Sequence, residues 1–147
     1  MTKSNVFDAA KYILEKTESV SSMKLQKLVY YAQAWSLAWD EAPLFDNKIE
    51  AWANGPVVRD LYDKHKGRYF VTPEIIENGK SDNLNSSQKE TIDAVLEAYG
   101  DKSAQWLSDQ THSGSPWIAA RSGLSESERG DKEIPLESIA EYYSSVK

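Results

Sequence analysis

His112 and the residues around it are the first group whose types could do chemistry. Asp109, Ser113 and Ser115 lie close to it in the sequence, and a histidine with a carboxylate and a hydroxyl is what a general base and its nucleophile require. A histidine near the end of a helix is, however, more often placed there by the helix dipole and a hydrogen bond. The pattern favours a structural His112, and catalysis by His112 is the alternative.

Metal and cofactor chemistry has little support in the sequence. The chain has two histidines, His65 and His112, and no cysteine, whereas a structural zinc site takes four nitrogen or sulfur ligands. The sequence contains no P-loop, no dinucleotide fingerprint and no G-x-S-x-G elbow. We therefore expect no metal, no cofactor and no enzymatic activity.

Aromatic and basic residues give a better case for binding. Trp52 and Trp117 each lie beside an expected loop or short helix, and tryptophan is enriched at the positions that dominate interface energies; core packing is the alternative for each. The stretch 59–68 forms a modest basic patch that would suit RNA or an acidic partner, or would be an ordinary solvated surface. Its charged residues are Arg59, Lys64, Lys66 and Arg68 against Asp60 and Asp63.

Gly55-Pro56-Val57 is the remaining candidate for a ligand site. Pro56 suits the first turn of a helix, and a helix start there would expose backbone amides to an anion. The alternative is a tight turn between a strand and a helix. In either case Gly55 is expected to need backbone angles that only glycine adopts at low cost.

Composition limits the class of protein. At 147 residues the chain has the size of one domain, expected over 1–147. Its net charge of -6 disfavours nucleic-acid binding. The excess of acid lies in residues 81–147 and would steer a basic partner toward the protein. The lack of cysteine and of a long apolar run predicts a cytoplasmic protein that does not enter membranes.

Helical periodicity runs through most of the chain. Asn5 can cap a helix that ends near Glu18, and apolar residues on two faces predict a central buried helix over 23–39. Leu28, Ala32 and Trp35 are expected at its buried centre. Residues 49–53 alternate as a strand does, and a second strand within 68–84 could pair with them. Leu44 and Phe45 should dock inward from the loop before this strand.

The second half also reads as helices with short joints. Ser87 with Glu90 predicts a capped helix ending at Gly100, and further helices are expected from Ser103 and from Ser115 to Gly123. Residues 125–133 are charged and predict a mobile surface loop, followed by a C-terminal helix over 135–146. The fold class expected is therefore mainly α: a compact helical domain with a central buried helix and a small two-stranded sheet.

Three stretches together resemble the Panacea-domain family, also called SocA-like or phage-associated. They are Lys24-Leu25-Gln26-Lys27-Leu28-Val29-Tyr30-Tyr31-Ala32-Gln33-Ala34-Trp35, then Pro43-Leu44-Phe45 through Ile49 to Val58 with Gly55-Pro56-Val57, and Leu107 to His112 with Pro116-Trp117. The resemblance covers about residues 6–121. The combination of KLQKL, GPV and TH with PW is far more specific than any one piece. Acidic residues are expected in the family at the positions of Gly114 and Ser115, so the resemblance does not extend to a His-carboxylate pair.

The resemblance implies a chiefly helical domain, found in prophages and small mobile operons, of a kind that neutralises a neighbouring toxin by direct contact. Some members are thought to hand the toxin to a protease. It also implies a structural role for the residues of the family motifs: Leu25, Gln26, Leu28, Trp35, Gly55, Pro56, Val57, Thr111, His112 and Pro116.

The sequence and the resemblance together predict a toxin-antitoxin protein that binds a cognate toxin encoded by the adjacent gene. The candidate contact residues are Lys27, Tyr31, Trp52 and Trp117, each on condition that it is not buried in the monomer. The alternative is a phage or prophage effector that binds a host protein, and a small hydrolase-type enzyme using His112 is less favoured.

Overall fold

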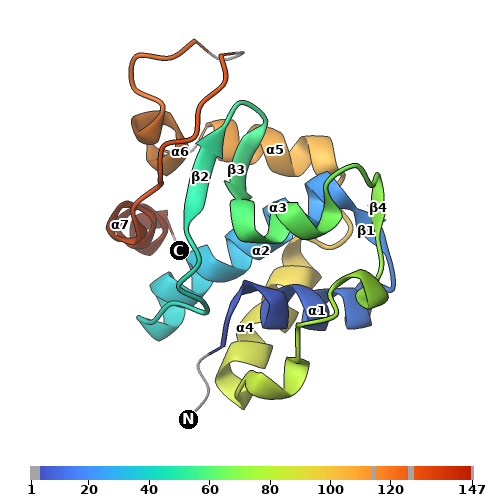
Figure 1. The fold of residues 1–147 in the computed structure, drawn as a ribbon. Helices are drawn as coiled ribbons and strands as arrows, with labels where there is room; N and C mark the ends of the chain where they lie inside the picture. Colours follow the sequence, from blue (N-terminus) through green and yellow to red (C-terminus); the bar gives the residue numbers. More distant parts are fainter. Residues whose placement is uncertain (1–3, 114, 126–127, 147) are drawn as a thin grey trace.

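The computed structural model describes residues 4–113, 115–125 and 128–146 and shows a mainly α fold, as predicted. The elements are arranged around the long helix α2 (Figure 1). The α-helices are α1 (Val6–Thr17), α2 (Ser22–Trp35), α3 (Arg59–His65), α4 (Ser86–Tyr99), α5 (Ala104–His112), α6 (Ser115–Ala120) and α7 (Leu136–Val146).

Two small antiparallel sheets complete the fold. β1 (Val20–Ser21) pairs with β4 (Phe70–Val71), and β2 (Ile49–Trp52) pairs with β3 (Gly55–Val58). The predicted partnership of 49–53 with a strand in 68–84 is therefore wrong, because β2 pairs with the strand that follows it. Short 3₁₀ turns, η2 (Pro73–Ile75) and η3 (Ser81–Asn83), connect β4 to α4.

The β2–β3 hairpin replaces the helix start expected at Pro56. Trp52 pairs with Gly55, so Ala53 and Asn54 form a two-residue turn, and the helix begins only at Arg59. Proline is tolerated in such a strand where no ladder hydrogen bond from its nitrogen is required. An anion site on helix-terminal amides at Gly55-Pro56-Val57 is thus excluded.

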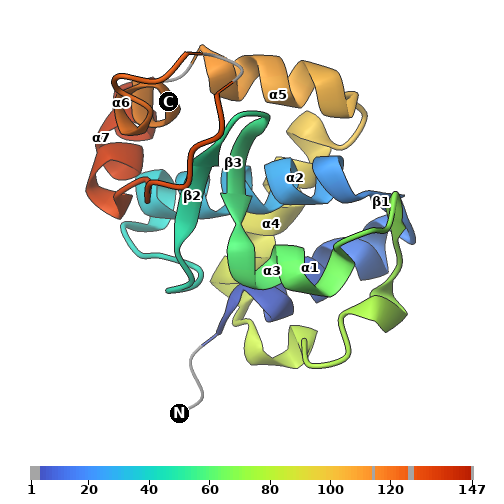
Figure 2. The same ribbon diagram turned by 45° about the horizontal axis from the view of Figure 1, so that its top comes forward.

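α2 is the central helix, with α1, α4, α5, α7 and β3 packed against it (Figure 2). The helix predicted over 23–39 is present, but its end continues as a π-helix, η1 (Ser36–Asp40). This places the ring of Trp39 on that of Trp35, with centroids 5.0 Å apart and planes inclined by 22°.

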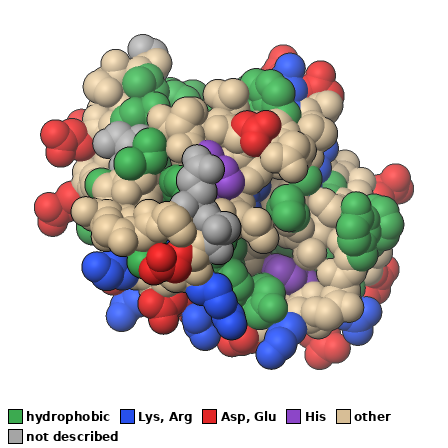
Figure 3. Space-filling view, turned by 90° about the horizontal axis from the view of Figure 1, so that it is seen from above, with side chains coloured by type: hydrophobic (Ala, Val, Ile, Leu, Met, Phe, Trp, Pro, Cys, Tyr) green, Lys and Arg blue, Asp and Glu red, His purple; other side chains and the backbone are tan. Residues whose placement is uncertain are grey.

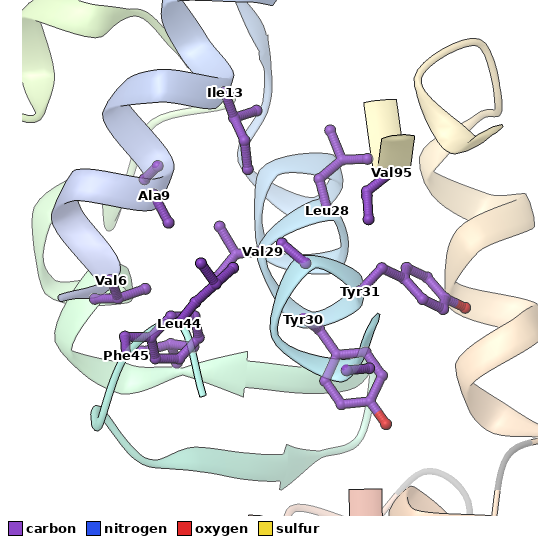
Figure 4. Close-up of a cluster of buried hydrophobic side chains, with 14 of the residues drawn as sticks. Val6, Ala9, Ile13, Leu28, Val29, Tyr30, Tyr31, Leu44, Phe45 and Val95 are labelled. Carbon is purple, nitrogen blue, oxygen red and sulfur yellow. The ribbon is translucent and has the colours of Figure 1, made fainter. Parts of the chain in front are cut away.

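The core gathers side chains from α1, α2, α4 and the loop before β2 (Figure 4). Leu28 and Ala32 are fully buried, as predicted. Trp35 is only half-buried, because it lies where α2 passes into η1 at the margin of the core, and its Nε1 donates to the hydroxyl of Tyr99.

Gln33 fixes the loop between η1 and β2. Its Oε1 accepts from the amide of Leu44 at 2.7 Å, and its Nε2 donates to the backbone oxygen of Phe45 at 2.8 Å. Both apolar residues are buried, so the prediction that they dock inward is confirmed.

Two of the three predicted helix caps lie at the predicted residues, and the third is shifted by two residues. Asn5 caps α1 and forms a capping box with Asp8, and Ser103 caps α5. For α4 the capping box is Asn85 with Gln88 rather than Ser87 with Glu90. Both pairs have the required spacing, so local sequence alone does not choose between them.

Candidate functional site

Gln26, in the first family motif, ties α2 to the hairpin. Its Oε1 accepts from the amide of Val58 at 2.9 Å, and its Nε2 donates to the oxygen of the same residue at 3.2 Å. The side chain thus bonds both backbone polar groups of Val58, as a neighbouring strand would. All of these groups are buried, which makes the pairing a requirement of the fold.

The same amide nitrogen reaches His65 at the end of α3. Nε2 of Gln26 lies 3.0 Å from Nε2 of His65. The two bonds to Val58 fix the orientation of the amide, so its nitrogen donates and the imidazole accepts, which requires a neutral ring. Burial lowers the pKa of His65, with a smaller contribution from the positive charge of Lys27.

Lys27 lies beneath the hairpin with 1% of its surface exposed. A Cβ placed on Gly55 would stand 2.6 Å from its Cε and 3.1 Å from Oγ1 of Thr111. Residues of all three family motifs therefore touch at this point. Burial lowers the pKa of Lys27 from 10.5 to about 8.

α5 and α6 hold the tip of the hairpin from the other side. Oγ of Ser108 donates to the oxygen of Asn54 at 2.9 Å, and Nε1 of Trp117 donates to the oxygen of Trp52 at 2.9 Å. His112 stacks on Trp117, with ring centroids 4.3 Å apart. Trp117 of the PW motif and Ser108, three residues before the TH motif, thus hold the backbone of the hairpin turn.

The outer edge of β2 is also covered. Nη1 of Arg121 donates to the oxygen of Ala51 at 3.0 Å, and its Nη2 donates to the oxygens of Ser125 and Glu128. Beyond them, residues 132–134 hydrogen-bond to β2 and pair with it at an antiparallel bridge. Residues 125–133 were predicted to form a mobile surface loop, but their described parts are anchored by hydrogen bonds to their backbone. The charge pattern of the sequence does not reveal these bonds. Residues 126–127 lie outside the described residues.

Three of the four predicted contact residues are buried. Lys27 and Trp117 support the hairpin, and Tyr31 stacks on Tyr99 with its hydroxyl directed to the oxygen of Leu107. By the stated condition they are withdrawn as surface contacts, because ring-rich helices bury these side chains in the core. Trp52 is half-buried and remains.

Trp52 forms one wall of a surface hollow of about 510 Å³, and we call the residues lining it the hairpin face. The ring of Tyr62 meets the indole edge-on at 4.9 Å, and the guanidinium of Arg59 lies over the indole at 5.4 Å. Glu50 accepts from both Nε1 of Trp52 at 2.8 Å and Nε of Arg59 at 3.2 Å. The hairpin face consists of Trp52, Arg59, Tyr62, Lys66, Arg129, Gly130 and Asp131.

A smaller hollow of about 180 Å³ lies beside it at the turn itself. Trp52, Arg129 and Gly130 line both hollows, and Ala53 and Asn54 complete the second. The view from above shows both histidines in purple, and blue basic side chains interspersed with red acidic ones along the lower edge (Figure 3). Of the residues that line the two hollows, Trp52, Arg59 and Lys66 were singled out from the sequence. Arg129 was missed because nothing near it in the sequence marks it.

Two of the neighbours predicted for His112, Asp109 and Ser113, form hydrogen bonds with other groups in the described residues. Oδ1 of Asp109 accepts from Gln105 at 2.9 Å, and Oγ of Ser113 donates to the oxygen of Gln110 at 3.0 Å. Gly114 lies outside the described residues. Within the described ranges, no group of three or more metal-ligating side chains gathers. None of the helices described there has the length and hydropathy of a transmembrane span.

One of three comparisons with known proteins identifies a family. A search of curated proteins and a search of solved structures returned no match. A family profile described as antitoxin SocA-like, Panacea domain, matches residues 25–118, which include all the motif residues that surround the hairpin. The chain belongs to the SocA-like antitoxin, Panacea-domain family.

Proposed function

We propose that this protein is a protein-binding antitoxin that neutralises a cognate toxin, the product of the adjacent gene, by direct contact. The observation that carries the proposal is the family match over the residues that hold the β2–β3 hairpin. The proposal includes that the protein acts in the cytoplasm and catalyses no reaction. It also treats residues 1–147 as one domain. Delivery of the bound toxin to a protease is the further step proposed with it.

The contact is assigned to the hairpin face. Three side chains bind backbone oxygens of β2 and the hairpin turn: Arg121 binds the oxygen of Ala51, Trp117 that of Trp52 and Ser108 that of Asn54. A surface held this firmly loses little conformational entropy on association. Trp52 supplies the aromatic anchor typical of such contacts.

The test is coexpression with the adjacent gene. The neighbour alone should arrest growth, and this protein should relieve the arrest and copurify with the neighbour's product. A shorter cellular half-life of that product in the presence of this protein, restored in a protease-deficient host, would support delivery.

Other outcomes of the same test contradict the proposal. A harmless neighbour that does not copurify would replace it by the second candidate, an effector that binds a host protein. Relief of toxicity that is lost in a stably folded His112→Ala variant, with complex formation intact, would instead favour an enzyme.

A further inference from the structure

We infer that the hairpin face binds an acidic segment of the partner protein. This rests on the proposed function and deepens it, because it gives the chemistry of the contact. It also reverses the expectation from net charge, which favoured a basic partner.

The charges at the hairpin face are opposite to those of the whole chain. The protein carries a net charge of -6, yet this hollow is lined by Arg59, Lys66 and Arg129 against one carboxylate, Asp131. Glu50 pairs with Arg59. Lys66 and Arg129 are exposed, and neither forms a salt bridge with any residue in the described part of the chain. Two cations are therefore available to incoming carboxylates.

The aromatic residues define what must accompany the carboxylates. Trp52 and Tyr62 meet edge-on and form an apolar wall beside the basic side chains. A hollow of about 510 Å³ admits several side chains rather than a whole domain surface. An acidic stretch containing one aliphatic or aromatic residue matches both features: the carboxylates pair with Lys66 and Arg129, and the apolar side chain packs on Trp52.

A protein segment fits better than RNA. Binding to a phosphate backbone depends on many cations that displace condensed counterions. This face has three, one of them already paired, on a protein whose net charge repels polyanions. A short acidic segment requires only the two available cations.

The first experiment measures affinity for the purified product of the adjacent gene by isothermal titration calorimetry at two salt concentrations. Lys66→Glu and Arg129→Glu should each weaken binding by about tenfold, and the wild-type affinity should fall with added salt. Lys80→Glu is the matched control, because it makes the same charge change at an exposed lysine outside the hairpin face. Wild-type melting temperatures for all three variants would confirm that they are folded.

The outcomes separate the two proposals. If the wild type, Lys66→Glu, Arg129→Glu and Lys80→Glu all bind with equal affinity, the inference of an acidic segment is overturned and the antitoxin proposal stands. Failure of the wild type to bind would count against the proposed function.

A second experiment then tests the hairpin face alone, by titrating a peptide of five glutamates and one leucine into ¹⁵N-labelled protein. The indole N–H resonance of Trp52 should shift in the wild type and in Lys80→Glu, and should not shift in the double variant Lys66→Glu/Arg129→Glu. No shift in the wild type, or a larger one with a single-stranded RNA of equal charge, would overturn the inference.

Discussion

Nε1 of Trp117 donates a hydrogen bond to the backbone oxygen of Trp52 across 2.9 Å. The two tryptophans that the sequence marks as possible anchors thus have different roles: Trp117 is buried and holds the hairpin, while Trp52 presents its indole at the surface hollow. Trp117 therefore supports the hairpin, and Trp52 is the tryptophan available to a partner.

Trp117→Phe should lower the free energy of unfolding by about 1–2 kcal/mol. Phenylalanine keeps a ring against His112 but removes the indole N–H, which leaves the oxygen of Trp52 without this donor. Urea denaturation measures the change. Trp106→Phe, at an exposed tryptophan, is the control and should change stability by less than about 0.5 kcal/mol. Equal effects of the two substitutions would contradict the supporting role.

Gln26→Leu should destabilise the protein by about 2–4 kcal/mol. The substitution leaves the buried amide and oxygen of Val58 without their side-chain partners. Gln105→Leu makes the same chemical change at an exposed site and should be nearly neutral. A loss at position 26 no larger than at position 105 would show that water or another group replaces the amide.

Gly55→Ala should cost about 1–3 kcal/mol, more than Gly67→Ala. Both glycines have positive φ, +121° and +83°, but a Cβ at Gly55 would meet Lys27 at 2.6 Å, whereas none of the described atoms lies within 4 Å of one at Gly67. The difference between the two variants in thermal denaturation contains the steric part, together with the difference in backbone strain between the two φ values. Equal costs would mean that Lys27 moves aside freely.

Lys27→Met should raise the free energy of unfolding at pH 7 by up to about 3 kcal/mol. This is the free energy that corresponds to the lowering of the Lys27 pKa from 10.5 to about 8. Below pH 8 the folded state holds a buried ammonium at full cost. Between pH 8 and 10 the unfolded state binds more protons than the folded state, so wild-type stability rises with pH.

Lys27→Met should not show this rise, and the two curves should converge toward pH 10. Chemical denaturation from pH 7 to 10 measures it. Parallel curves would show that Lys27 is not the titrating group. Below pH 6.5 both proteins should lose stability, because burial lowers the pKa of His65 and protonation opposes its bond to Gln26. The loss should be smaller in Lys27→Met, since the charge of Lys27 contributes to the lowered pKa.

Local signals predicted the helices well, because caps and apolar stripes lie within a few residues of each other. Asn5 and Ser103 cap helices as expected. The hairpin was missed because Gly55-Pro56 suits a strand edge and a helix start equally, and only contacts with Gln26 and Ser108 decide between them.

The candidate site was only partly predictable for the same reason. Trp52 was identified from its residue type alone. Lys27 was predicted as a surface contact, although its place on a helix that is apolar on most sides already indicated burial. Arg129 comes to Trp52 through the anchoring of a distant segment by Arg121, which no local pattern encodes.

The most direct measurement of the central claim is the affinity of the purified adjacent-gene product for Trp52→Ala. If the hairpin face is the contact, this variant should bind about 30-fold more weakly than wild type, as expected for an aromatic hot spot. Trp106→Ala, which removes an exposed tryptophan outside the hairpin face, should bind within about twofold of wild type. Unchanged affinity of a folded Trp52→Ala variant, or an equal loss in both variants, would contradict the assignment of the contact to the hairpin face.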